Sequence, residues 1–198
     1  IGSSSSIVTL SSTGSLDYET ATSHDIEVTA TSDDTSTSTQ SYTIAVTDFD
    51  EYDVSAVSDD DSNGNTLAEN ASSGAAVGIT AAASDSDGTS NTITYSLSSN
   101  PGSLFAIDGS TGIVTLSGSL DYETATSHTI EVTATSADAS TSTASYDIAV
   151  TDVDEYNVST INDADTANDE VPEGASSGTQ VGITASASDG DDSNDTIT

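Results

Sequence analysis

The sequence contains no lysine, arginine, cysteine, methionine or tryptophan. Without a fixed positive charge it cannot bind nucleic-acid phosphates, coat an anionic membrane or hold an anionic substrate with arginine. The lack of cysteine excludes disulfides and thiolate metal sites. No apolar run reaches the length of a membrane span, and the N-terminus lacks the charged and apolar regions of a signal peptide. We therefore expect an interior piece of a longer protein, with no direct membrane insertion in this segment.

Negative charge is abundant: 34 Asp and Glu give a formal net charge of −34 over 198 residues. Only nine of these are Glu, although a solvated helical surface would favour Glu. Asp favours turns, and its short carboxylate is a good ligand for hard cations. Val, Ile, Leu and Phe make up roughly 18 % of the chain, which lies in the range typical of intrinsic disorder. Either the chain stays open, or cations from solution fold it.

A long internal repeat organises the chain. Residues 16–24 (LDYETATSH) return unchanged at 120–128, an offset of 104 residues. Residues 47–52 and 77–81 also recur at this offset, whereas residues 7–10 recur at an offset of 106. The repeat is much longer than a solenoid unit and matches a self-contained domain in a tandem array.

The acidic segments are taken as the seams between repeats. On that basis the chain holds the C-terminal part of one repeat (1–53), one complete repeat (54–157) and the N-terminal part of the next (158–198).

Within the complete repeat, apolar and polar residues alternate with the period of half-buried strands. Ile130, Val132 and Ala134 give the clearest run, and similar segments are 77–83, 93–97, 113–116 and 146–150. About seven short strands separated by Gly, Pro and Asn turns predict an all-β fold of tandem Greek-key antiparallel β-sandwich domains, immunoglobulin-like in architecture, of about 104 residues each. The Ser- and Thr-rich stretches 32–41 and 136–145 are expected to be polar hairpins.

The carboxylates recur at defined places: in mid-repeat turns, at the seams, and after an alanine-rich strand. In each Asp-X-Asp pair of an extended segment, the two carboxylates point the same way and can share an ion. Ca²⁺ takes about six to eight oxygen ligands, so several turns would have to converge. Glu69 and Glu173 are expected to begin a strand after an Asp-rich loop.

Several ordered motifs resemble the successive calcium motifs of cadherin domains. These are residues 171–174 (VPEG), 120–123 (LDYE), 150–155 (VTDVDE) and 85–88 (DSDG), preceded by 105–108 (FAID) and 111–114 (TGIV). The Ser/Thr/Asp-rich, lysine-poor composition further resembles that of the cadherin-like repeats of giant bacterial surface adhesins, including the repeats-in-toxin type exported by type I secretion. The nonapeptide repeats that end such proteins are absent from this sequence.

The resemblance implies about two or three Ca²⁺ ions at each seam, bound by one repeat and the start of the next. The first seam would use Asp17, Glu19, Asp48, Asp50, Glu51, Asp85 and Asp87. The second would use Glu69, Asp121, Glu123, Asp152, Asp154, Glu155, Asp189 and Asp191. Glu173 and Asp138 are further candidate ligands. The linker departs from the family pattern, because Asp154-Glu155-Tyr156 stands where the family has Asn-Asp-Asn, and the following proline is missing.

Other chemistry has less support in the sequence. Isolated acids such as Asp59 to Asp61 and Glu170 are interpreted as solvated surface. His24 and His128 are expected in a turn before a strand, with structural roles, and a Ser-His-Asp set of adjacent residues cannot form a catalytic triad. A glycosidase cleft is usually lined by aromatic side chains, which are few here. We expect no enzyme activity.

The sequence favours a calcium-rigidified extender segment of a large extracellular adhesin, which spaces a distant binding domain from the cell surface in adhesion or biofilm formation. Attachment to the cell would use parts of the parent chain not present here. Its partners would be the adjacent repeats. Two alternatives stay open: either the repeats themselves bind other copies or surface glycans, or they build an extracellular filament or surface layer.

Overall fold

The computed structural model describes residues 5–191 and 196–198. The chain is divided into two compact units. Unit 1 comprises Ile1–Ala56, Ala83–Thr94 and Ala134–Ser142, and unit 2 comprises Val57–Ala82, Tyr95–Thr133 and Thr143–Thr198. The unit borders do not follow the repeat borders, because two loops of the complete repeat belong to unit 1 together with the first repeat.

Unit 1 is built around an antiparallel hairpin of β1 (Ser23–Thr31) and β2 (Thr37–Ala45). The register runs from Ser23 opposite Ala45 to Thr31 opposite Thr37. In the turn, Thr35 has a φ of 69°, and the Asp34 carboxylate accepts the Ser36 N–H at 3.0 Å. The predicted polar hairpin is confirmed, because Asp and Ser side chains satisfy the turn backbone that a linker would leave to water.

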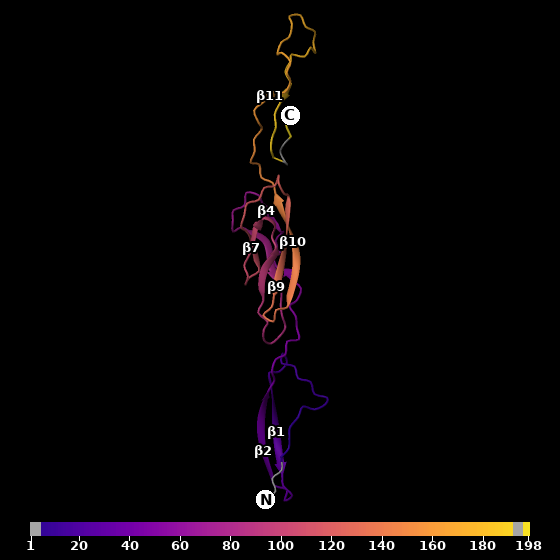
Figure 1. Cartoon of the computed structure of the whole chain (residues 1–198), viewed down its shortest axis with the longest axis vertical. Coiled ribbons are helices and arrows are strands. Elements are labelled where there is room, and N and C mark those ends of the chain that lie inside the picture. Colours follow the sequence, from indigo (N-terminus) through magenta and orange to yellow (C-terminus); the bar gives the residue numbers. More distant parts are fainter. Residues whose placement is uncertain (1–4, 192–195) are drawn as a thin grey trace. The chain divides into compact units, whose positions relative to one another are not determined.

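Unit 2 contains most of a β-sandwich formed by two four-stranded sheets (Figure 1). One sheet has the order β4-β10-β9-β6, with bounds Thr66–Ala68, Thr141–Thr151, Ser127–Thr135 and Thr94–Ser99. The other has the order β3-β5-β8-β7, with bounds Ser58–Asp59, Ala76–Ala82, Ile113–Leu116 and Phe105–Ile107. A short 3₁₀ segment, η1 (Pro101–Ser103), precedes β7, and β11 (Asn162–Asp163) pairs with β12 (Ala185–Ser186).

Both sheets contribute alternate residues to one hydrophobic core. Ile130 and Val132 of β9 are fully buried, as are Val77 of β5 and Val114 of β8, and these residues belong to a single cluster. The period-two pattern therefore placed the core residues on the correct faces, and the predicted all-β sandwich is confirmed.

Three details of the sequence interpretation are wrong. Glu69 follows β4 instead of beginning a strand, and Glu173 lies in a turn. His24 and His128 lie within β1 and β9, and the His128 ring packs edge-on against Phe105 at a centroid distance of 5.9 Å. The sheets are also not wholly antiparallel, since β4 pairs with β10 in parallel.

Asp59 is more than solvated surface. Its Oδ1 atom accepts the N–H groups of Asp61 and Thr80, both at 3.0 Å, and therefore connects the loop after β3 to strand β5.

Candidate metal sites

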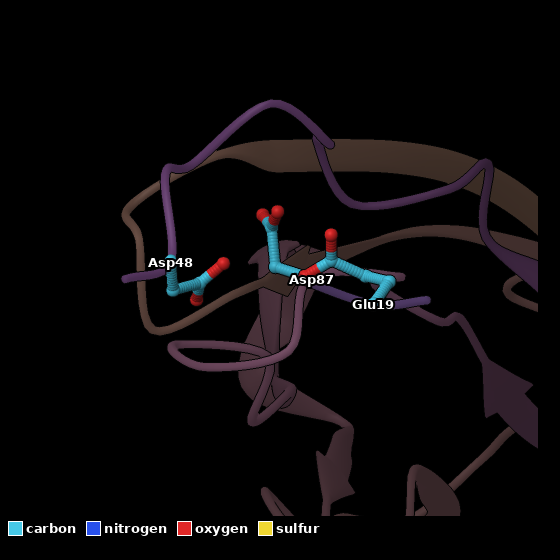
Figure 2. A group of neighbouring side chains, drawn as sticks. All are labelled: Glu19, Asp48 and Asp87. Atoms are coloured by element: carbon cyan, nitrogen blue, oxygen red, sulfur yellow. The ribbon is translucent and has the colours of Figure 1, made fainter. Parts of the chain in front are cut away.

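The first acidic site lies in unit 1 and joins three separate stretches of chain. Carboxylate oxygens of Glu19, Asp48 and Asp87 lie within 4.8 Å of one another. Glu19 comes from the turn before β1, Asp48 follows β2, and Asp87 lies in the loop after β5. Figure 2 shows the carboxylates of Glu19 and Asp48 directed toward Asp87 from either side. Glu19 and Asp48 belong to the first repeat and Asp87 to the complete one, so residues of both repeats form this group.

Hydrogen bonds fix the loops that carry these carboxylates. The Gly88 N–H donates to Glu19 Oε1 at 2.8 Å, and the Thr89 hydroxyl donates to Asp48. The Glu51 N–H donates to Asp87 Oδ1 at 3.3 Å. Each of these bonds joins the first repeat to residues 87–89, which keeps the acidic side chains together without a cationic partner.

Two oxygens at this site have no hydrogen-bond partner among the described residues although they are buried. They are Asp48 Oδ1 and Asp87 Oδ2. Asp87 is only 2 % exposed. Removing a carboxylate oxygen from water without a compensating partner is costly, so both atoms point to a cation.

A second group in unit 1 shares Asp87. Asp50, Asp87 and Asp138 bring their ligand atoms within 4.8 Å of one another. Asp138 lies in the turn between β9 and β10, where its Oδ1 atom accepts the Ser140 N–H at 2.7 Å. The sequence pattern assigned this residue to neither seam, because a turn of the complete repeat has no visible link to the linker at residues 48–51.

Unit 2 holds a corresponding site built from two groups that share Asp152. Glu69, Glu123 and Asp152 form one, and Asp152, Glu155 and Asp191 form the other. Glu69 is 7 % exposed, and its two oxygens accept the N–H groups of Tyr122 at 2.6 Å and Val153 at 2.8 Å. A single buried carboxylate therefore connects the start of the repeat, its middle and its end.

The sequence repeat relates the two sites. Glu123, Asp152 and Asp191 are the copies of Glu19, Asp48 and Asp87 at the 104-residue offset. The Glu155 N–H donates to Asp191 Oδ1 at 3.3 Å, as the Glu51 N–H does to Asp87. Asp191 is 1 % exposed. This one hydrogen bond thus forms in both copies, although none of the acidic groups found among the described residues is the copy of another.

Crowding raises several carboxyl pKa values at both sites. Desolvation raises the pKa of Asp50, with the Asp138 charge as the next cause. Desolvation also raises the pKa of Glu51 and of Glu155, followed by the charges of Glu19 and Glu69 respectively. The nearby Asp191 charge raises the pKa of Asp154. Each shift favours the protonated form, and a bound cation would oppose it, because a positive charge favours the ionised carboxylate.

These residues fit Ca²⁺. Two oxygens that bind one Ca²⁺ at about 2.3–2.6 Å can lie at most about 5 Å apart. The ligand oxygens of each group lie within 4.8 Å of one another, so one ion could contact all of them. The donors are carboxylates, which suit a hard cation, and the chain has no Lys or Arg to neutralise them.

Of the seventeen predicted ligands, ten fall in these four groups. They are Glu19, Asp48, Asp50, Glu69, Asp87, Glu123, Asp138, Asp152, Glu155 and Asp191. Seven are in none of the groups found among the described residues: Asp17, Glu51, Asp85, Asp121, Asp154, Glu173 and Asp189. The ligand role of each of the seventeen residues stays a prediction.

Some of these seven have local structural roles. Asp17 accepts the Thr20 N–H at 3.0 Å, and Asp121 accepts the Thr124 N–H at 2.8 Å, so both stabilise the turn that carries the following Glu. Asp85 accepts the Ser136 hydroxyl, which lowers the Asp85 pKa. The Asp85 carboxylate also accepts the Asp87 N–H at 3.1 Å, so it stabilises the loop that carries Asp87.

Neutral residues that order the site escaped the sequence interpretation. Thr89 and Ser136 donate to Asp48 and Asp85. In a chain so rich in Ser and Thr, nothing distinguishes these two from the others before the fold is known.

Comparison with known proteins identifies the family. The cadherin domain model matches residues 65–151. Mouse protocadherin Fat 4 is 35 % identical over 134 residues, which are 68 % of this chain and 3 % of that protein, and its human counterpart is 34 % identical over the same length. The chain thus spans only a small part of these relatives.

Solved structures support the fold. The protocadherin gamma B7 extracellular domains 1–4 match with a TM-score of 0.65 and 26 % identity over 89 % of this chain and 42 % of that one. Mouse cadherin-23 EC22–24 matches with a TM-score of 0.68 and 21 % identity over 90 % of this chain and 57 % of that one.

These relatives are animal cadherins and protocadherins. They give no support to the resemblance to bacterial adhesins that was inferred from the amino-acid composition. The family is non-enzymatic, in agreement with the prediction of no enzyme activity. None of the helical segments that the structure describes is long and apolar enough to span a membrane. The sandwich, the paired acidic sites and the match over residues 65–151 identify a cadherin domain in this chain.

Proposed function

We propose that this chain is a calcium-stiffened spacer in the extracellular part of a larger cell-surface protein. The observation that carries the proposal is the composition of the acidic groups, since three of the four combine side chains of successive repeats. Calcium would supply positive charge that holds both repeats at once. Without it, the carboxylates repel one another and the joint gains freedom.

The repeat borders and the ligands form part of the proposal. The domains are residues 1–53, 54–157 and 158–198, with the joints near residues 48–53 and 152–157. Each joint binds about two or three ions, through the four groups above and through the turn residues beside them. Extracellular modules can use weak sites of about 10⁻⁴ to 10⁻³ M, because calcium is abundant outside cells.

Small-angle scattering of the 198-residue chain tests the proposal. We expect calcium to narrow the distribution of conformations and chelator to broaden it, since the joints are then free to bend. Scattering profiles that are identical with calcium and with chelator would contradict it.

A triple variant makes this test specific to the site. Glu19→Gln, Asp48→Asn and Asp87→Asn together remove the charge of the first group while keeping side-chain size. The control replaces three exposed acids outside the groups, Asp33, Asp60 and Glu170, by their amides. We expect the calcium-induced change in the scattering profile to be smaller in the triple variant and unchanged in the control.

A second candidate function is association between copies. The protocadherin gammaB7 EC3–6 structure is a cis-dimer, with a TM-score of 0.60 to this chain. Analytical ultracentrifugation with and without calcium tests it, and glycan arrays test the related hypothesis that the repeats bind surface sugars.

The bacterial adhesin context is a narrower hypothesis. It rests on the absence of Lys and Arg and on the Ser/Thr/Asp-rich texture. The full parental gene decides it: type I secretion signals and a separate ligand-binding domain beside the repeats would support it, and an animal-type membrane anchor would oppose it.

A further inference from the structure

The loop between β3 and β4 contains the only Asn-Gly pair of the sequence, Asn63-Gly64. Both residues are exposed and line an open polar depression, so water reaches them. They contribute neither to the hydrophobic core nor to the acidic groups. Asparagine loses ammonia most readily before glycine, because glycine has no Cβ atom to shield its main-chain nitrogen from the asparagine side chain.

The fold does not require glycine at this position. Gly64 is not among the glycines with a positive φ. A Cβ atom there would meet only Thr66 Cγ2, at an ordinary contact distance of 3.4 Å. The third repeat has Asn168 at the corresponding position. A side chain is therefore compatible with the loop, and what glycine contributes is access to its nitrogen.

The hydrogen bonds of the loop favour attack by that nitrogen. Among the described residues, no acceptor binds the Gly64 N–H, so its proton can pass to water or hydroxide. Asp61 Oδ1 accepts the main-chain N–H of Asn63 at 2.9 Å and a side-chain N–H at 2.6 Å. Since an ionised carboxylate can only accept, the amide nitrogen of Asn63 faces Asp61. There the carboxylate stabilises the positive charge that this nitrogen gains as it leaves.

We propose that Asn63 deamidates spontaneously through Gly64. The deprotonated Gly64 nitrogen attacks Asn63 Cγ, the Cγ–Nδ2 bond breaks, and Nδ2 takes up a proton from water and leaves as ammonia. Water then opens the succinimide ring. Attack at Cγ gives an aspartate at position 63. Attack at the main-chain carbonyl carbon gives isoaspartate, in which the chain runs through the former side chain.

Isoaspartate would lengthen the main chain by one methylene where the loop is closely packed. A Cβ atom at Gly78 would lie 2.6 Å from the Gly64 carbonyl oxygen. The Ala149 N–H donates to the Asn65 carbonyl at 2.9 Å, next to the pairing of β4 with β10. The extra methylene must shift these groups, so β4 loosens, and with it Glu69, which follows β4 directly.

Mass spectrometry of peptides from the aged 198-residue chain tests the proposal. After incubation at mildly alkaline pH, we expect the peptide with Asn63 to gain the mass of an NH₂ replaced by OH, and an isoaspartyl methyltransferase to label it. Gly64→Ala should react at least about tenfold more slowly, because its methyl group shields the nitrogen. Asn100 is an internal control that should stay intact, since Pro101 has no N–H.

Asn63→Ala is the second control, and its peptide should stay unmodified. The third repeat supports its folding, because Ala167 occupies the corresponding position and its N–H donates to Asp165 Oδ1 at 2.7 Å. Circular dichroism should show both variants to be folded. An unmodified Asn63 in the aged parent, or equal rates in the parent and Gly64→Ala, would overturn the proposal.

Hydrogen exchange on the separated isoaspartate form tests the structural consequence. We expect faster exchange than in the fresh chain for residues 64–69 and for Ala149. Identical exchange would contradict the loosening of β4. Deamidation is a covalent change that is measured without calcium, so failure of this inference and failure of the spacer function are distinguishable.

Discussion

The acidic residues of this chain have two different structural roles, and the residue type alone does not distinguish them. Some, such as Asp34 and Asp108, accept N–H groups within their own turns. Others, such as Asp87, are buried among further carboxylates. The first kind stabilises the fold as an anion by itself, whereas the second kind destabilises it until a cation binds.

The shared carboxylate of unit 1 is the most sensitive single ligand. Because Asp87 belongs to two groups, we expect Asp87→Asn to weaken calcium binding in unit 1 at least tenfold, which is about 1.4 kcal/mol. Isothermal titration calorimetry measures this, with the exposed Asp60→Asn as the control. Equal affinities in the two variants would argue against a ligand role for Asp87.

Asp108 predicts a pH dependence far from the metal groups. The N–H groups of Thr111 and Ser110 lower its pKa. A lowered pKa in the folded state contributes stability above the pKa of the unfolded chain, and that stability is lost as the pH falls through the folded-state value. Urea unfolding at equal calcium concentration should show Asp108→Ala to be less stable than the parent near neutral pH.

That difference should shrink as the pH falls from the ordinary Asp range through the lower folded-state pKa of Asp108, because below that pKa both states of the parent are protonated. A difference that does not change with pH would mean that the charge of Asp108 has no part in its role.

At the scale of strands and turns, the complete repeat depends on one close backbone contact. Gly112 has a φ of 72°, and its carbonyl accepts the Ala81 N–H at 2.9 Å between β5 and β8. A Cβ atom there would lie 2.2 Å from the Ala81 carbonyl oxygen. The pairing that joins the two halves of the repeat therefore requires glycine at this position.

Two alanine variants separate backbone strain from this clash. Gly74 also has a positive φ of 92°, but nothing lies within 4 Å of a Cβ atom there. We expect Gly74→Ala to cost about 1–2 kcal/mol from the left-handed conformation. Gly112→Ala should cost at least about 2 kcal/mol more, because the strands must move apart. Denaturant unfolding measures both, and similar losses would show that the clash is relieved cheaply.

At the scale of the whole molecule, the net charge links stability to calcium. If each of two joints bound about three Ca²⁺, about twelve positive charges would be added, which leaves a net charge near −22. The remaining charge still keeps molecules apart in solution. The disorder-like composition then describes the calcium-free chain better than the calcium-bound one.

Chelation should therefore lower the melting temperature of the chain, and sodium chloride should recover only part of the loss. Salt screens repulsion between exposed carboxylates, but it screens buried groups such as Asp87 and Asp191 much less. Differential scanning calorimetry in calcium, in chelator, and in chelator with salt checks this. Full recovery by sodium chloride would mean that specific calcium ligation adds nothing to general screening.

The strand pattern, the repeat and the candidate carboxylates can be predicted from the sequence. Period-two alternation depends on local geometry, so Ile130 and Val132 could be assigned to the core without a fold. The repeated LDYE segment likewise drew attention to Glu19 and Glu123 before their neighbours in space were known.

Which carboxylates lie close together depends on the folded chain. It brought Asp138 to Asp50 and Asp87, and it left Asp17 and Asp121 in their turns, although all of these are acidic residues in turns or at the seams. Convergence depends on contacts between loops far apart in the chain, and the spacing of residues along the chain carries no information about such contacts. For the same reason, the sequence did not predict the parallel pairing of β4 with β10, which joins residues more than eighty positions apart.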